Sequence, residues 1–203
     1  AKKSVLDALE VLKGLGATVE EVSLPHSKYA LAAYYILSSS EASSNLSRFD
    51  GIRYGFRAEG VKNLMELYKE TRAQGFGDEV KRRVIVGTAV LSSESYDVYF
   101  MQAARVRRMI ADSFNTAFEQ CDLIVCPSSA GTAMPLSSDL KPLEYYALDL
   151  FTVAMNLAGI PACSVPCGLA TNGLPLGMQV VGARFDDMRV LQLAKHIETA
   201  ANI

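Results

Sequence analysis

Apolar residues recur every three or four positions through six stretches of the chain, the spacing of one face of an α-helix. In the run 95–118, one stripe carries Tyr99, Ala103, Ile110 and Phe114. The pattern therefore predicts a protein in which helices predominate. The predicted helices cover residues 4–13, 26–47, 63–73, 78–90, 95–118 and 186–200.

Four shorter segments have the pattern of β-strands instead. Residues 17–25 alternate between apolar and polar, whereas 122–127, 162–168 and 176–182 are short apolar runs. An Asn-Gly pair lies between the last two runs and predicts a tight turn, so we expect these two strands to form an antiparallel hairpin. Many helices with few strands predict an α/β fold, in which a mixed β-sheet is flanked by helices.

Composition and charge narrow the class of protein. The chain has 203 residues, of which 50% are hydrophobic and 21% are charged, as in a globular domain. A net charge of −2 argues against broad attraction to nucleic acid or to an anionic membrane. The sequence has no apolar run near the roughly 20 residues of a membrane helix and no signal peptide, so we expect a cytoplasmic protein without a membrane partner.

The cysteines are a possible metal site. Cys121, Cys126, Cys163 and Cys167 have the spacings C-x4-C and C-x3-C, without the C-x2-C pairs and histidines of common zinc sites. We therefore expect buried, reduced thiols rather than metal ligands.

The segment SSSEASSNLSRFDGIRYG, residues 38–55, is rich in hydroxyl groups. A serine nucleophile needs a base within hydrogen-bond reach and donors for the oxyanion, and this segment has no nearby histidine and no strained glycine turn. A flexible linker is also disfavoured, because residues 38–47 contain no Gly, Pro or Lys. We interpret the serines as small packing residues that let another element approach a helix closely.

Several longer blocks resemble the amidase signature family. NLAGIPACSVPCGLATNGLPLGMQVVG, residues 156–182, and CDLIVCPSSAGTA, residues 121–133, are similar to the C-terminal half of that family. The serine-rich block, together with GFGDEVKRRVIVGT at residues 75–88, is similar to the glutaminase subunits of tRNA-dependent amidotransferases. The resemblance covers nearly the whole chain and implies an amidase-type α/β/α sandwich.

The resemblance also implies which part of an enzyme this chain is. The family's catalytic residues are a serine, a second serine with a cis peptide and a lysine, with a loop resembling G-G-S-S-G-G-S that this sequence lacks. We therefore expect residues 1–203 to be the C-terminal part of a single amidase domain, inactive without an N-terminal catalytic portion. A departure lies at Ser128, where the family commonly has threonine.

The activity implied by the resemblance is that of a ligase complex in protein biosynthesis. Its glutaminase subunit hydrolyses glutamine, and the ammonia converts Glu-tRNA(Gln) to Gln-tRNA(Gln). The implied partners are a kinase subunit, which binds tRNA and uses ATP and Mg, and a third, small subunit. This chain itself is expected to need no cofactor and to meet tRNA mainly through its partner. It also lacks the phosphate-binding pattern G-x-x-x-x-G-K-[ST].

The resemblance implies residues that recognise glutamine. A guanidinium suits the carboxylate because it donates two parallel hydrogen bonds, and this role falls to Arg82, or else to Arg83. An aspartate suits the ammonium, and this role falls to Asp149. Tyr34 or Tyr35 adds a contact.

Structural interpretations of these residues remain open. Arg82 follows Asp78 by four positions and could form a surface ion pair, and Asp149 could cap the following helix. The two tyrosines could be core aromatics. For the whole protein, a stand-alone amidase acting on another small amide and a non-enzymatic α/β binding module are the alternatives.

Three further residues match the family pattern. Gly177 lies within a predicted strand and predicts close approach by a neighbouring group. Gln179 and Asn156 are expected to be buried amides that hold loops.

Overall fold

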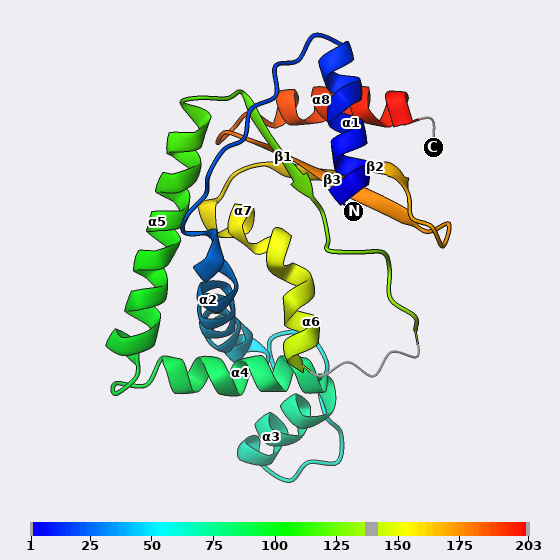
Figure 1. Cartoon of the computed structure of the whole chain (residues 1–203). Helices are drawn as coiled ribbons and strands as arrows, with labels where there is room; N and C mark the ends of the chain where they lie inside the picture. Colours follow the sequence, from blue (N-terminus) through cyan, green and yellow to red (C-terminus); the bar gives the residue numbers. More distant parts are fainter. Residues whose placement is uncertain (1, 137–141, 202–203) are drawn as a thin grey trace. The chain divides into compact units, whose positions relative to one another are not determined.

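The computed structural model describes residues 2–136 and 142–201 (Figure 1). Contacts between Cα atoms divide the chain into two compact units. Residues 1–31 and 106–203 form the first, which we call the sheet unit, and residues 32–105 form the second, which we call the helical unit.

Among its described residues, the sheet unit contains three strands, in the order β1-β3-β2. Both pairings are antiparallel, so the predicted hairpin of β2 and β3 is confirmed. Its turn includes Gly173, whose φ of 77° lies in the left-handed region that favours glycine. The predicted α/β fold is also confirmed, but the described strands form an antiparallel sheet rather than the mixed sheet that was expected. The strands are β1 (Leu123–Pro127), β2 (Ala162–Leu169) and β3 (Pro175–Gly182).

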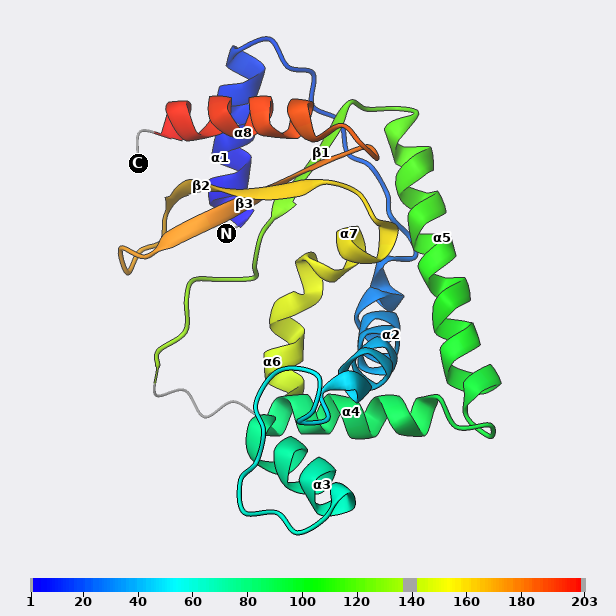
Figure 2. The same cartoon turned by 180° about the vertical axis from the view of Figure 1, so that it is seen from behind.

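Two helices, α1 (Lys2–Gly14) and α8 (Asp187–Ala201), cover one face of this sheet, as both views show (Figures 1 and 2). Alternate residues of the strands point toward them, and the apolar core of the unit lies between the two layers. This core explains why the first and last described helices, α1 and α8, lie on the same face of the sheet. Its buried residues are Val5, Leu12, Val165, Cys167, Leu176, Met178, Val180, Val190, Ala194 and Ile197.

Residues 142–158, which come between β1 and β2 in the chain, lie on the side of the opposite face of the sheet (Figures 1 and 2). This segment contains α6 (Pro142–Leu148), a 3-10 turn (Asp149–Phe151) and α7 (Val153–Ala158). Five of the six residues of α7 are buried, and Gly159, with a φ of 69°, ends the helix in the left-handed region. The turn Asp149–Phe151 therefore enters a helix that is fixed by burial on most of its surface.

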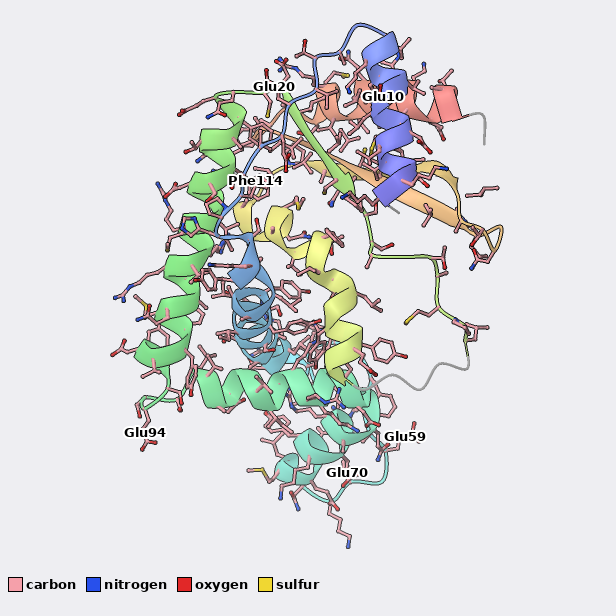
Figure 3. All side chains as sticks on the ribbon, viewed as in Figure 1. Glu10, Glu20, Glu59, Glu70, Glu94 and Phe114 are labelled. Carbon is pink, nitrogen blue, oxygen red and sulfur yellow. The ribbon has the colours of Figure 1, made fainter. Side chains whose placement is uncertain are left out.

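A long helix, α5 (Met101–Phe118), follows a π-helical turn at Tyr96–Phe100 and confirms the prediction for residues 95–118. The predicted apolar stripe is buried at Ala103, Ile110 and Phe114. Phe114, labelled in Figure 3, has no exposed surface.

The helical unit contains most of α2 (Ala30–Asn45), then α3 (Leu64–Gly75) and α4 (Asp78–Val90). These helices confirm the predictions for residues 26–47, 63–73 and 78–90. Asn63 caps α3, because its side chain accepts a hydrogen bond of 2.9 Å from the backbone N–H of Glu66.

The serine-rich segment packs α2 against α4. A Cβ placed at Gly87 of α4 would overlap the carbonyl of Ser39 and lie 2.8 Å from the Cβ of Ser43. The hydroxyl groups of Ser43 and Thr88 are hydrogen-bonded at 2.9 Å, and the buried Ser40 donates a 2.8 Å hydrogen bond to the carbonyl of Ile36. The interpretation of the serines as packing residues is confirmed for Ser39, Ser40 and Ser43, whereas Ser44 is exposed.

The strand predicted at residues 17–25 is wrong, because the structure assigns no strand to this segment. Alternation of apolar and polar residues marks an extended segment with two unlike sides, but a strand also requires a hydrogen-bonded neighbour.

Candidate substrate-binding site

Three of the predicted site residues lie together in the helical unit. Tyr34 and Tyr35 on α2 are half-buried, and their rings meet edge to face with centroids 5.1 Å apart. The guanidinium of Arg83 on α4 lies 5.5 Å from the centroid of the Tyr35 ring, within reach of a cation–π contact. The tyrosines are therefore neither fully buried core aromatics nor free surface groups.

Glu79 joins both predicted arginines. Its carboxylate accepts a hydrogen bond of 3.0 Å from Nε of Arg83, and its other oxygen pairs with Nη1 of Arg82. Asp78, the partner expected for Arg82 in the surface-pair interpretation, pairs instead with Lys81 at 3.7 Å. Glu79 was missed in the sequence, although its spacing of three and four residues from the arginines is the spacing of helical ion pairs.

The electrostatics of this cluster favour the charged forms of Glu79 and Arg83. Partial burial alone would raise the pKa of Glu79, but the hydrogen bond from Arg83 and the charges of Arg82 and Arg83 hold that pKa below its usual value. The hydrogen bond to Glu79, assisted by one to Tyr34, raises the pKa of Arg83. Glu79 thus pairs with both arginines at once.

The two arginines differ in exposure. The side chain of Arg82 is 49% exposed and that of Arg83 is 30% exposed. Arg83 also contacts both tyrosines, so its position is fixed from two sides. This difference favours Arg82 as the guanidinium that an incoming carboxylate can reach, and Arg83 as the group that orders the tyrosines.

Asp149 begins the 3-10 turn of the sheet unit and is half-buried. Its main-chain carbonyl accepts hydrogen bonds from the N–H of Thr152 at 3.0 Å and from its Oγ1 at 3.1 Å. Thr152, rather than Asp149, holds the N-cap position of α7, and its side chain makes no cap hydrogen bond there. Asp149 and the arginines lie in different units, and their convergence stays a prediction.

Gln179 and Asn156 have different roles. Gln179 is buried, and its side-chain amide donates a 2.8 Å hydrogen bond to the carbonyl of Phe151, which confirms that it holds a loop. Asn156 is exposed and donates to the carbonyl of Thr152 at 2.9 Å, within its own helical turn. The prediction of a buried amide was therefore wrong for Asn156.

Gly177 lies in the middle strand between two serines. A Cβ at this position would lie 2.9 Å from Oγ of Ser128 and 3.0 Å from Oγ of Ser164, so the predicted close approach is confirmed. The two hydroxyl groups are hydrogen-bonded to each other at 2.6 Å across the glycine. Ser128, where the family commonly has threonine, thus serves as a link between strands.

All four cysteines are free thiols, and burial raises the pKa of each. Cys167 is buried and the other three are half-buried. In the part of the chain that the structure describes, no three His, Cys, Asp or Glu side chains gather as metal ligands. None of its helices is long and apolar enough to cross a bilayer.

The model of the Amidase family matches residues 1–191. The chain belongs to the amidase family. Two of its relatives, both named as the A subunit of glutamyl-tRNA(Gln) amidotransferase, come from Lysinibacillus sphaericus and Halalkalibacterium halodurans. The first is 61% identical over 98% of this chain, and the second is 56% identical over 99%. This amidase chain spans 41% of the length of each.

Solved structures agree with this assignment. A crystal structure of the A subunit of glutamyl-tRNA(Gln) amidotransferase from Thermotoga maritima is 41% identical and has a TM-score of 0.69. The match covers 95% of this amidase chain and 37% of that protein. A structure described as an amidase is 25% identical, with a TM-score of 0.72, over 98% of this chain and 41% of its own. The likeness confirms the amidase-type α/β fold.

Proposed function

We propose that this chain is the C-terminal part of the glutaminase subunit of a tRNA-dependent amidotransferase, a ligase of protein biosynthesis in the cytoplasm. The observation that carries the proposal is the 61% identity, over 98% of the chain, to a relative named as the A subunit of that enzyme. The complete protein hydrolyses glutamine, and the ammonia converts Glu-tRNA(Gln) to Gln-tRNA(Gln).

In this proposal the chain recognises the amino-acid end of glutamine. Arg82 donates hydrogen bonds to the α-carboxylate, and Asp149 accepts from the α-ammonium. Arg83 holds Tyr34 and Tyr35 against this site. The geometry of the helical unit supports these roles, because Arg82 is the more exposed of the two arginines and Arg83 contacts both tyrosines.

The nucleophile belongs to the remainder of the relatives' length. There, a serine Oγ attacks the amide carbon of glutamine, the C–N bond breaks, and ammonia leaves with the proton of the serine. Water then hydrolyses the acyl-enzyme to glutamate and regenerates the serine. Three serines of α2 do not serve this step, since Ser39 and Ser40 are buried and Ser43 bonds to Thr88.

Two partner subunits complete the proposed assembly. The kinase subunit binds tRNA and uses ATP and Mg to activate Glu-tRNA(Gln), the other is the small subunit, and this chain needs no cofactor of its own. The net charge of −2 agrees with tRNA being bound mainly by a partner, since nucleic-acid binding relies on clustered positive charge.

Ammonia release from glutamine tests the proposal. The complete protein in its complex is expected to release ammonia from glutamine, and residues 1–203 alone are expected to release none. Butyramide, which lacks both the carboxylate and the ammonium, is the comparison substrate. Equal kcat/KM for butyramide and glutamine would favour a stand-alone amidase, and turnover by residues 1–203 alone would contradict the proposed division of labour.

A further inference from the structure

The middle strand β3 carries a buried side-chain amide. Gln179 is 6% exposed and lies opposite Cys126 on β1 and Ser164 on β2. Its neighbours Met178 and Val180 belong to the core under α1 and α8. Because successive side chains of a strand point to opposite faces, Gln179 points to the face that carries the turn Asp149–Phe151.

The amide of Gln179 has a specific partner on that face. Its Nε2 donates a 2.8 Å hydrogen bond to the carbonyl of Phe151, the last residue of the turn that Asp149 begins, and it lies 3.5 Å from Sγ of Cys126. A buried amide is costly unless it is paired, so this bond ties the turn to the sheet.

The rest of the segment is held at its other end. Arg107 donates to the carbonyl of Leu157 at 3.0 Å, and Arg184 donates to that of Ala158 at 3.5 Å, so two positive charges lie at the C-terminus of α7. The segment is thus fixed at two places, at Phe151 by Gln179 and at the C-terminal end of α7 by the two arginines.

We propose that Gln179 is a positioning residue for substrate recognition: it fixes the turn Asp149–Phe151 and thereby sets where the carboxylate of Asp149 lies. The inference rests on the proposed binding of the glutamine ammonium by Asp149. A carboxylate that pairs with one ammonium must be held to within about 0.5 Å, and Asp149 lies only two residues before the anchored carbonyl.

Gln179→Met tests this inference in the complete protein assembled with its partner subunits. Methionine keeps the length of the side chain and removes the donor. We expect the KM for glutamine to rise roughly tenfold with little change in kcat, because a misplaced Asp149 weakens substrate binding but takes no part in the chemical step. Glutaramate, which is glutamine without its ammonium, should inhibit the variant and the wild type with the same inhibition constant.

Asp149→Asn measured in parallel separates the two proposals. It is expected to raise the KM for glutamine roughly a hundredfold and to leave glutaramate inhibition unchanged. In that background Gln179→Met should add nothing further to KM. If Asp149→Asn leaves the KM unchanged, the proposed role of Asp149 is wrong. If Asp149→Asn raises it and Gln179→Met does not, only the role of Gln179 is wrong.

Two further variants complete the experiment. Asn156→Ala removes an amide-to-carbonyl hydrogen bond within α7 and is expected to leave KM unchanged. Gln179→Glu keeps the size of the side chain, and its carboxyl group donates a hydrogen bond when protonated, so its KM should lie closer to the wild type at pH 6 than at pH 8.

If Gln179→Met does not fold, Gln179→Glu tests the positioning role of Gln179. A wild-type KM for Gln179→Glu at both pH values would overturn the inference. So would an equal weakening of glutamine and glutaramate, since that is the result of general damage to the site.

Discussion

Gly87 on α4 lies so close to the main-chain carbonyl of Ser39 on α2 that no side-chain carbon fits between them. The approach is possible because both residues are small and because the hydroxyl of Ser40, which follows Ser39, bonds back to its own helix. This contact sets the spacing of the two helices that carry Tyr34, Tyr35 and Arg83.

Gly87→Ala should therefore destabilise the protein. The added methyl group forces the helices apart, and overpacking of this kind costs about 1 to 3 kcal/mol. Thermal unfolding of the complete protein measures the effect as a fall in Tm. Gly14→Ala is the matched control, because no atom lies within 4 Å of its added carbon. Equal Tm values for both variants would show that α2 and α4 do not pack as described.

Ser40→Ala should leave the glutaminase activity proposed for the complete protein intact. The hydroxyl of Ser40 is buried and bonds to the carbonyl of Ile36, so its loss removes a local hydrogen bond and no reacting group. We expect kcat for glutamine to stay within about twofold of the wild type, since the removed bond is worth only about 1 kcal/mol of stability. A loss of activity without a loss of Tm would reopen the assignment of a nucleophile to this segment.

Glu79→Gln should change the dependence of stability on pH. The pKa of Glu79 in the folded protein lies below its ordinary value of 4.5, because the stabilising effect of Arg83 and Arg82 exceeds the effect of burial. A carboxyl group with a lowered pKa stabilises the folded state above its unfolded pKa, and the contribution is lost as pH falls through the folded pKa. The wild type should therefore be more stable than the variant at pH 7.

Thermal unfolding of both proteins at pH 7 and pH 3.5 checks this sign. The difference in Tm between the wild type and Glu79→Gln should be larger at pH 7 and should shrink at pH 3.5. A difference that grows as pH falls would mean that the pair of Glu79 with the arginines does not form.

The helices of this chain were predictable because their signals are local. Apolar spacing placed α4 at Asp78–Val90, and the Asn-Gly turn placed the hairpin of β2 and β3. The strand prediction for residues 17–25 was wrong because alternation of apolar and polar residues is a property of one segment, whereas a strand needs a second segment that pairs with it. Local patterns also missed α6, whose seven residues are too short for a clear period.

The candidate site was predictable only in part. The resemblance to the amidase family pointed to Arg82 and Asp149, and no spacing in the sequence required either choice. Glu79 was missed, although it lies three and four residues before Arg82 and Arg83 and pairs with both. The anchoring of the turn at Phe151 by Gln179 joins residues 28 positions apart, so only a three-dimensional structure reveals it.

In the proposed site, Arg82 recognises the α-carboxylate of glutamine. Arg82→Lys keeps the positive charge and removes the planar pair of donors, so we expect the KM for glutamine to rise at least about tenfold with kcat nearly unchanged. 4-Aminobutanamide, which lacks the carboxylate, should inhibit the variant as well as it inhibits the wild type.

The most direct measurement is the KM for glutamine of the complete protein with Arg82→Lys, beside the wild type and Arg83→Lys. We expect the KM for glutamine to rise strongly in Arg82→Lys and less in Arg83→Lys. Inhibition of Arg82→Lys by 4-aminobutanamide should equal that of the wild type. A wild-type KM for glutamine in Arg82→Lys would contradict the proposed role of Arg82. A larger rise of this KM in Arg83→Lys would assign binding of the glutamine carboxylate to Arg83.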